Sequence, residues 1–391
     1  MKNLQQAEPI PQQARQAIED MLQSGDLFRY TAKENAPVTL LEQEFAEMMG
    51  SRFALAVASC SAALFLTLKT LDLKPDAKVI IPGFTFAAVP SAVVHANCQP
   101  VLVEVGDNFR LDMDDFKAKL NDDIGAVLIS HMRGHTSDMD EILRLCKAKN
   151  IPVIEDAAHS LGTTWNGQKI GTMGVVGCFS FQSYKLVNGG EGGILITDDE
   201  DIIAKAVIMS GAYENNWQKH GCDTDSFARY QNTLPLYNTR MNNLSATVIR
   251  PQLAEVPRRA ANGLRNHDHL AARLNSHPNL HVPPALQPEH RAPDSIQFLL
   301  ENLNEAQARA LMKTSAAVGL PVQIFGLHSE NARVFWNWKF IPNLPELPKT
   351  RAMLMRACDL RLPASLTLED VDTIADALLT CMDQVVHARA A

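Results

Sequence analysis

Two short apolar runs, each followed directly by polar residues, constrain the fold of this chain more than any other feature. The run 151–154 is too short for a helix and is typical of a buried parallel strand. It ends in Glu155-Asp156, so a carboxylate lies at the carboxyl end of the predicted strand. The second run, 175–181, leads to Lys185 and then to a glycine-rich loop, 189–193. Because open α/β sheets bind ligands at the carboxyl ends of their strands, we expect Asp156 and Lys185 to share a site.

An acid and a lysine beside a glycine-rich loop suit one kind of cofactor. A lysine amine can form a Schiff base with an aldehyde, and a carboxylate can keep a pyridine nitrogen protonated. Each residue alone also has an ordinary interpretation, Lys185 as a solvated loop lysine and Asp156 as a helix cap. For either residue taken singly, both interpretations stay open.

Three motifs in fixed order resemble the DegT/DnrJ/StrS family of sugar aminotransferases. They are Glu155-Asp-Ala-Ala-His159, Phe179-Ser-Phe with Lys185 four residues on, and Gly190-Glu-Gly-Gly193. The resemblance extends from about residue 42 to the C-terminus. It implies the aspartate-aminotransferase-like fold (PLP fold type I), with a mainly parallel central sheet in a large domain and a smaller α+β C-terminal domain. It also implies the cofactor pyridoxal 5'-phosphate (PLP) and a homodimer with shared active sites.

The same resemblance gives roles to individual residues. Lys185 would hold PLP as a Schiff base and move a proton during catalysis, and Asp156 would hold the pyridine nitrogen. The other positions that match cofactor contacts of the family are Ser61, Ala62, Phe86, His159, Ser180 and Asn238. The asparagine would reach the cofactor phosphate of the other subunit. Taken from the residues alone, Ser59 or Ser61 could simply cap a helix, and Phe86 could belong to the core.

Strand and helix alternate from residue 53 onward, as in α/β proteins with a mainly parallel sheet. The predicted strands are 53–58, 78–81, 101–105, 126–130, 152–155, 175–181 and 194–197. The predicted helices are 11–24, 40–49 and 138–150, with one or more long helices in 244–274. Residues 277–293 hold five prolines and mark a connection. We therefore expect a large PLP-binding domain with an N-terminal arm over residues 1–250, and a linking helix and small domain over 251–391.

Composition excludes several classes of partner. The chain has 391 residues and a net charge of −8 without a basic block, which argues against nucleic acid. It has neither the apolar core of a signal peptide nor a run of roughly 18 apolar residues, so we expect a cytoplasmic protein without a membrane span. Seven scattered cysteines without a CxxC pair fit reduced thiols. His131 and His135 have the spacing of metal ligands, but Gly134 and the missing third ligand argue against a metal site.

The family resemblance implies the reaction, whereas the acceptor has to be inferred from departures from the family pattern. An amino acid, expected to be L-glutamate, would give its nitrogen to a keto- or aldehydo-sugar. We expect the acceptor near segments 28–37, 213–236 (interpreted as a long loop over the cofactor) and 328–339. These carry isolated cations, Arg29, Lys33, Arg229 and Arg333. Isolated arginines suit a single carboxylate better than a diphosphate.

The sequence as a whole also resembles family members that aminate an oxidised 3-deoxy-octulosonate at carbon 8 for lipopolysaccharide. The expected acceptor is therefore 8-oxo-3-deoxy-octulosonate, and a nucleotide-linked ketosugar is the alternative. A PLP-dependent sugar dehydratase and a non-catalytic PLP-binding regulator are further alternatives, although dehydratases of this family usually carry histidine where this chain has Lys185. Trp336 and Trp338 could bind a sugar ring or pack in the small domain. No G-x-G-x-x-G fingerprint follows a strand, which disfavours a nicotinamide oxidoreductase.

Overall fold

Seven strands form the central sheet, and each lies within two residues of a predicted strand. The computed structural model describes residues 2–31, 35–222 and 225–387. The strands are β1 (Phe53–Val57), β2 (Lys78–Pro82), β3 (Gln99–Val103), β4 (Ile124–Ser130), β5 (Val153–Asp156), β8 (Val176–Ser180) and β9 (Gly193–Thr197). Their order is β1-β9-β8-β5-β4-β2-β3. β9 runs in the direction opposite to the other six strands, so the sheet is mainly parallel, as predicted.

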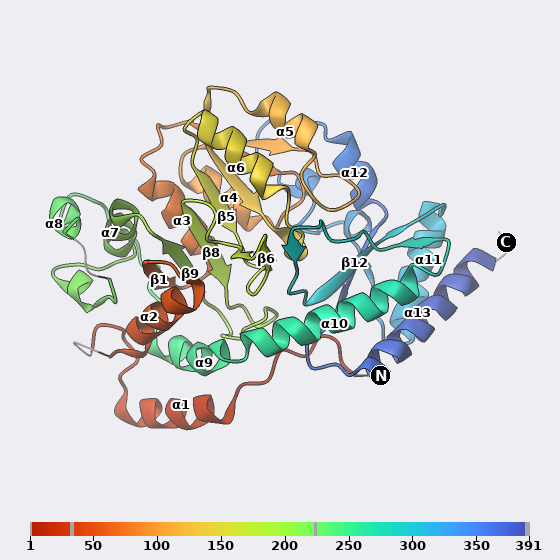
Figure 1. Cartoon of the computed structure of the whole chain (residues 1–391), viewed down its shortest axis with the longest axis horizontal. Helices are drawn as coiled ribbons and strands as arrows, with labels where there is room; N and C mark the ends of the chain where they lie inside the picture. Colours follow the sequence, from red (N-terminus) through yellow and green to blue (C-terminus); the bar gives the residue numbers. More distant parts are fainter. Residues whose placement is uncertain (1, 32–34, 223–224, 388–391) are drawn as a thin grey trace.

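Helices cover both faces of this sheet because each strand is apolar on both sides. In β1, for example, Leu55 packs into one hydrophobic core and Ala56 into the other. One core includes α3 (Cys60–Thr70), α4 (Ala88–His95) and α7 (Glu200–Met209). The other includes α2 (Pro37–Met49), α5 (Met113–Lys119), α6 (Met139–Ala148) and α9 (Asn243–Leu253). Figure 1 shows the sheet between these layers.

A smaller domain is built on a second sheet with its own core. Its strands are β10 (Leu280–His281), β12 (Ser295–Leu300), β14 (Ala357–Arg361) and β13 (Gln323–Ile324), all antiparallel in that order. Its helices are α11 (Glu305–Ala317), α12 (Pro348–Leu354) and α13 (Leu368–His387). The long helix α10 (Val256–Leu274) links the two domains (Figure 1). The predicted division at residue 250 stays a prediction, and Leu4 packs in the core of the second sheet.

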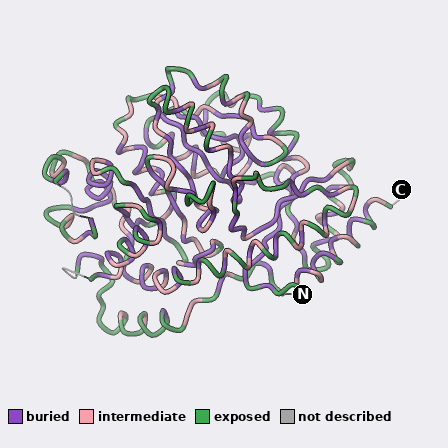
Figure 2. The backbone as a smooth tube through the Cα atoms, viewed as in Figure 1, coloured by how far each residue is buried: buried purple, intermediate pink, exposed green. Residues whose placement is uncertain are grey.

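The proline-rich connection carries more structure than its composition indicates. It contains β10 and β11 (Glu289–His290), and β11 pairs with β6 (Thr164–Trp165), which pairs with β7 (Gln168–Lys169). The N-terminal helix α1 (Gln12–Ser24) lies on the outside of the large domain and is mostly exposed (Figures 1 and 2). No helix in the described part of the chain combines the length and the apolar character needed to cross a membrane.

Segment 213–236 is expected to lie over the cofactor region, and none of its described residues lines the cavity of its own chain that contains Asp156 and Lys185. Its position toward the cofactor of a second subunit stays a prediction. The segment forms the short helices η2 (Asn216–Lys219) and α8 (Phe227–Tyr230) beside α7 (Figure 1). Phe227 is 1% exposed and stacks on Trp217, with ring centroids 4.8 Å apart. This aromatic pair anchors the segment to the hydrophobic core that includes α7.

A buried polar cluster joins the same segment to the N-terminal arm. Arg29 donates two hydrogen bonds to Glu42, at 2.9 and 3.0 Å, and His220 Nε2 lies 2.8 Å from the Tyr30 hydroxyl. The guanidinium of Arg29 and then His220 lower the pKa of Glu42 to about 2 against the effect of burial, and burial lowers the pKa of His220 to about 4. Arg29 therefore serves the architecture of the arm.

Candidate active site

Asp156 and Lys185 meet at the carboxyl ends of two neighbouring parallel strands, as predicted. Asp156 is the last residue of β5 and pairs in register with Cys178 of β8, and Lys185 follows the end of β8. Both line one cavity of about 560 Å³. Large-domain residues that line this cavity include Ser59, Cys60, Ser61, Phe86, Arg133, Asp156, His159, Ser180, Tyr184 and Lys185. The small domain contributes Pro321, Gln323, Arg333, Asp359 and Arg361.

The carboxylate of Asp156 is held by neutral donors. The Ser130 hydroxyl donates to Oδ2 (2.7 Å), and the Ala158 N–H donates to Oδ1 (3.1 Å). The Cys60 thiol lies 3.8 Å from Oδ1, and burial raises the pKa of this thiol well above its ordinary value. Among the described residues, no lysine, arginine or histidine side chain forms a hydrogen bond or ion pair with Asp156. A buried carboxylate of this kind still has the capacity to bind a cationic N–H group.

The amine of Lys185 lies against the ring of His159. Its Nζ is 2.7 Å from His159 Nε2 and 3.2 Å from Nδ1. Burial lowers the pKa of Lys185 to about 8, so a substantial fraction of the amine is neutral near physiological pH. Burial, followed by the Lys185 charge, lowers the pKa of His159 well below its ordinary value, which keeps the imidazole neutral. When protonated, the amine of Lys185 can therefore donate a hydrogen bond to the neutral imidazole inside the cavity.

Of the predicted phosphate contacts near the start of α3 and the end of β8, some line the cavity and one is engaged in capping α3. Ser59 caps α3, and its hydroxyl accepts the Ala62 N–H (3.1 Å), so the N–H of Ala62 is already paired. Ser61 in the first turn of α3 and Ser180 at the end of β8 both line the cavity, whereas Ala62 does not. The N-terminus of an eleven-residue helix and two serine hydroxyls provide donors for an anion at this end.

The two phenylalanines of the Phe84-Thr-Phe86 segment have different environments. Phe84 is 1% exposed and packs against Phe325 in a core cluster. Phe86 is 48% exposed and lines the cavity. Of the two, Phe86 is thus the aromatic that can cover a planar ligand.

Asn238, like Ala62, is a predicted cofactor contact that does not line this cavity. It is exposed and is not among the lining residues. Its role toward a second subunit stays a prediction.

Three charged residues of the cavity, Arg133, Asp359 and Arg361, had no site role predicted from the sequence. Arg133 has a left-handed backbone (φ 56°, ψ 24°) that is uncommon for a residue other than glycine, and its guanidinium pairs with Asp359 of β14. Arg361, at the end of the same strand, stacks on Tyr184 with its guanidinium carbon 4.8 Å from the ring centroid. A signal was present in the sequence, because Asp359 and Arg361 alternate with apolar residues and therefore share one face of a strand.

The isolated cations expected near an acceptor mostly have other partners. Arg29 pairs with Glu42 and Arg229 with Asp201, whereas Arg333 lines the cavity. Lys33 lies outside the described residues. Trp338 is 1% exposed and donates to the Ala332 carbonyl (2.9 Å), so it belongs to the core.

Trp336 also has a partner outside the cavity. It lies under the guanidinium of Arg351, 4.3 Å from the ring centroid. Neither tryptophan is among the cavity-lining residues.

The two histidines with metal-ligand spacing have separate partners. His131 Nε2 lies 3.2 Å from Glu155, and His135 Nε2 lies 2.9 Å from Gln297. No group of three metal-ligating side chains occurs in the described ranges.

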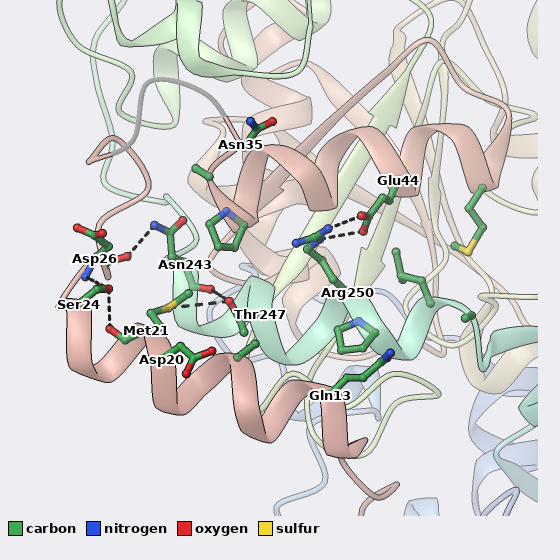
Figure 3. A pocket seen from close by; sticks show the side chains of 17 residues that line it. Gln13, Asp20, Met21, Ser24, Asp26, Asn35, Glu44, Asn243, Thr247 and Arg250 are labelled. Atoms are coloured by element: carbon green, nitrogen blue, oxygen red, sulfur yellow. Dashed lines mark hydrogen bonds and ion pairs between the residues drawn. The ribbon is translucent and has the colours of Figure 1, made fainter.

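A second, larger hollow lies between α1, α2 and α9 and has a volume of about 1020 Å³. Its prominent polar groups bond to one another or to backbone atoms (Figure 3). Arg250 donates to Glu44 (2.9 Å), and Asn243 donates to the Asp26 carbonyl (2.8 Å). This hollow shares no lining residue with the Lys185 cavity.

The residues of the Lys185 cavity fit PLP. Lys185 is an amine for its aldehyde, Asp156 is a buried acceptor for its ring nitrogen, and Phe86 offers an aromatic face. Ser61 and Ser180 also line the cavity, and their hydroxyl groups are donors of the kind that its phosphate requires.

Comparisons with known proteins agree with this geometry. Over residues 9–379, the chain matches the model of the DegT/DnrJ/EryC1/StrS aminotransferase family. It is 31% identical to GDP-perosamine synthase of Vibrio cholerae over 62% of each chain. Its alignments span about half to three fifths of the length of the curated relatives.

Solved structures share the fold over nearly the whole chain. An aminotransferase of Helicobacter pylori involved in the biosynthesis of pseudoaminic acid has a TM-score of 0.85 at 17% identity, covering 98% of this chain and 100% of that one. The GDP-4-keto-6-deoxy-D-mannose-3-dehydratase of Escherichia coli with bound hydrated PLP has a TM-score of 0.83 at 20% identity, covering 95% and 98%. By the match of its sequence to the family model, this chain belongs to the DegT/DnrJ/EryC1/StrS aminotransferase family.

Proposed function

We propose that this chain is a PLP-dependent aminotransferase that moves the amino group of an amino acid, L-glutamate, onto the carbonyl of a sugar. One observation carries the proposal: a lysine amine with a pKa lowered to about 8 shares a cavity with a buried carboxylate that has no cationic partner among the described residues. Family membership and the fold support it. When bound, PLP would supply an aldehyde that accepts the amine and a ring that accepts electrons.

The residues of the chain would bind and orient the cofactor and move the proton. Asp156 accepts the ring N–H, and Ser130 holds the carboxylate in place through its 2.7 Å hydrogen bond. Lys185 removes and returns the proton of the reacting carbon, and the adjacent neutral His159 keeps the amine oriented. Ser61 and Ser180 bind the phosphate, and Phe86 excludes water from one ring face.

Borohydride trapping tests the assignment of Lys185. Holoenzyme reduced with borohydride and digested should carry the pyridoxyl label at Lys185. Lys205 and Lys169 are internal controls that should stay unlabelled. Lys205 is ion-paired with Asp72, and Lys169 is exposed at the surface. A label that mapped to Lys205 or Lys169 would show that the assignment is wrong.

The colour of the cofactor separates an aminotransferase from the other classes. Adding L-glutamate should convert the absorbance of the aldehyde form into that of the amine form, and 2-oxoglutarate should be released. A regulator that only binds PLP would show no conversion. A sugar dehydratase would consume its sugar without transferring nitrogen to it, and Lys185 counts against that activity because such family members usually carry histidine there.

For the acceptor, we propose 8-oxo-3-deoxy-octulosonate, a free acidic sugar of lipopolysaccharide synthesis. Arginines in the cavity support an acidic substrate, since Arg333 and Arg361 line it. A nucleotide-linked ketosugar is the second candidate, favoured by the similarity to GDP-perosamine synthase. The two can be compared directly with L-glutamate as donor. Amination of a nucleoside diphosphate sugar with no amination of 8-oxo-3-deoxy-octulosonate would end the first proposal.

We further propose that the working unit is a cytoplasmic homodimer with shared sites. Exposed Asn238 would complete the phosphate site of the other subunit, and the buried free cysteines suit a reducing compartment. Lys185→Ala and Asn238→Ala chains should each be inactive. Mixed after dissociation and reassociation, they should regain part of the wild-type activity, and a fully active monomer would contradict the proposal.

A further inference from the structure

The small-domain side of the cavity presents two guanidinium groups that form no ion pair within the described part of the chain. Arg361 is 9% exposed, and its Nη1 is buried without a hydrogen-bond partner among the described residues. Its described contact is the stack on Tyr184. Arg333 is partly buried, and no hydrogen bond or ion pair of its side chain occurs among the described residues. Burying a charged group without a partner is costly, so these arginines are arranged to receive an anion.

The two aspartates that line the same cavity, Asp359 and Asp156, do not meet this demand. Asp359 accepts from Arg133 and from Gln297 Nε2 (2.9 Å), so its two oxygens are already engaged. Asp156 lies at the end of β5 and is held by Ser130. Nearby charges still act on the arginines at longer range: burial lowers the pKa of Arg361, and Asp294 opposes that effect.

The position of this pair separates it from the cofactor contacts. Lys185, Ser61 and Ser180 belong to the large domain, whereas Arg361 ends β14 and Arg333 precedes η4 (Phe335–Asn337) in the small domain. A substrate could therefore place its reacting carbon at Lys185 and its anionic end on the opposite wall. Planar guanidinium groups bind a carboxylate through two parallel hydrogen bonds, and stacking on Tyr184 orients one of them in advance.

We propose that Arg361 and Arg333 form one carboxylate site that binds the amino donor and an acidic acceptor in turn. This inference rests on the proposed function, because an aminotransferase admits its two substrates successively into the same cavity. A shared carboxylate end lets one pair of arginines position both substrates. It also defines the substrate class as carboxylate-bearing compounds on both sides of the reaction.

Glutarate is a suitable probe, because it has the carboxylates of glutamate but no amine to react. Titrated calorimetrically into the PLP-loaded protein, it should bind wild type and bind Arg361→Gln about 10- to 100-fold more weakly. Arg333→Gln should also weaken binding, by a smaller factor because this side chain is less buried. Arg351→Gln is the matched control: it removes the same charge from an exposed arginine of the small domain outside the cavity, and should leave glutarate affinity unchanged.

Thermal unfolding distinguishes a binding role from a structural one. Since Arg361 has no hydrogen-bond partner to lose, Arg361→Gln without glutarate should unfold within about 4 °C of wild type. Unchanged glutarate affinity in Arg361→Gln, or a much larger fall in its unfolding temperature, would overturn the proposal. If that variant does not fold, the guanidinium is structural and the proposal fails in the same way.

Kinetics test whether the site is shared. Arg361→Gln should raise KM about 10- to 100-fold for both L-glutamate and the acidic acceptor, with a smaller effect on kcat. A KM effect on glutamate alone would overturn the shared site. Displacement of glutarate by GDP, with Arg361→Gln losing more affinity for GDP than for glutarate, would show a diphosphate site instead. A protein that binds glutarate through Arg361 but transfers no nitrogen would refute the proposed function and leave the carboxylate site standing.

Discussion

Replacing Asp156 by asparagine would remove one charge from the cavity and leave its shape almost unchanged. The carboxylate is 7% exposed and accepts hydrogen bonds from the Ser130 hydroxyl and the Ala158 N–H, both neutral donors. A protonated ring nitrogen would be its charged partner. One such charge-assisted hydrogen bond is worth about 1.5–3 kcal/mol. If all of it appears in the transition state, Asp156→Asn slows the donor half-reaction by about one to two decades.

The measurement is a single turnover of the PLP-loaded enzyme with L-glutamate, followed by the absorbance of the bound cofactor. We expect Asp156→Asn to retain the cofactor, because the amine and phosphate contacts remain. Asp123→Asn is the matched control, since its exposed pairing with Lys78 contributes little. A near-wild-type rate in Asp156→Asn with full cofactor occupancy would refute the role of the carboxylate.

Three further predictions concern protonation and packing. Because burial lowers the pKa of Lys185 to about 8, PLP uptake by the cofactor-free protein should rise about tenfold per pH unit up to pH 8 and level off above it, as measured by absorbance. Burial lowers the pKa of His220 to about 4, so between pH 6.5 and pH 4 the unfolded chain binds a proton at this residue and the folded protein does not. The free energy of unfolding should therefore fall by about 2 kcal/mol between pH 7 and pH 5 because of this group. Urea denaturation of His220→Gln should show a smaller fall over the same interval. A Cβ at Gly193 would lie 2.3 Å from the Cys60 nitrogen, so Gly193→Ala should displace the start of α3 and weaken PLP binding at least about tenfold in a cofactor titration, and unchanged affinity would contradict that packing.

The sequence alone predicted the strands of the central sheet and that Asp156 and Lys185 would share a site, whereas the order of the strands came from the structure. Each strand is a short apolar run bounded by polar or turn residues, which is a local signal. The site followed from the sheet because β5 and β8 are parallel neighbours, so Asp156 and Lys185 had to emerge at one edge. The family was indicated separately, by the resemblance of the three ordered motifs to those of known members.

Residues that depend on contacts between distant segments were decided only by the tertiary structure. Arg133 and Asp359 pair across 226 positions, and Arg361 enters the cavity because the small domain packs there. The described part of segment 213–236 is held against the hydrophobic core by the stacked pair Phe227 and Trp217. These positions depend on hydrophobic packing and charge pairing between segments that are far apart in the sequence. The pattern along the chain therefore predicted the residues at the strand ends, but not the residues that the small domain contributes to the cavity.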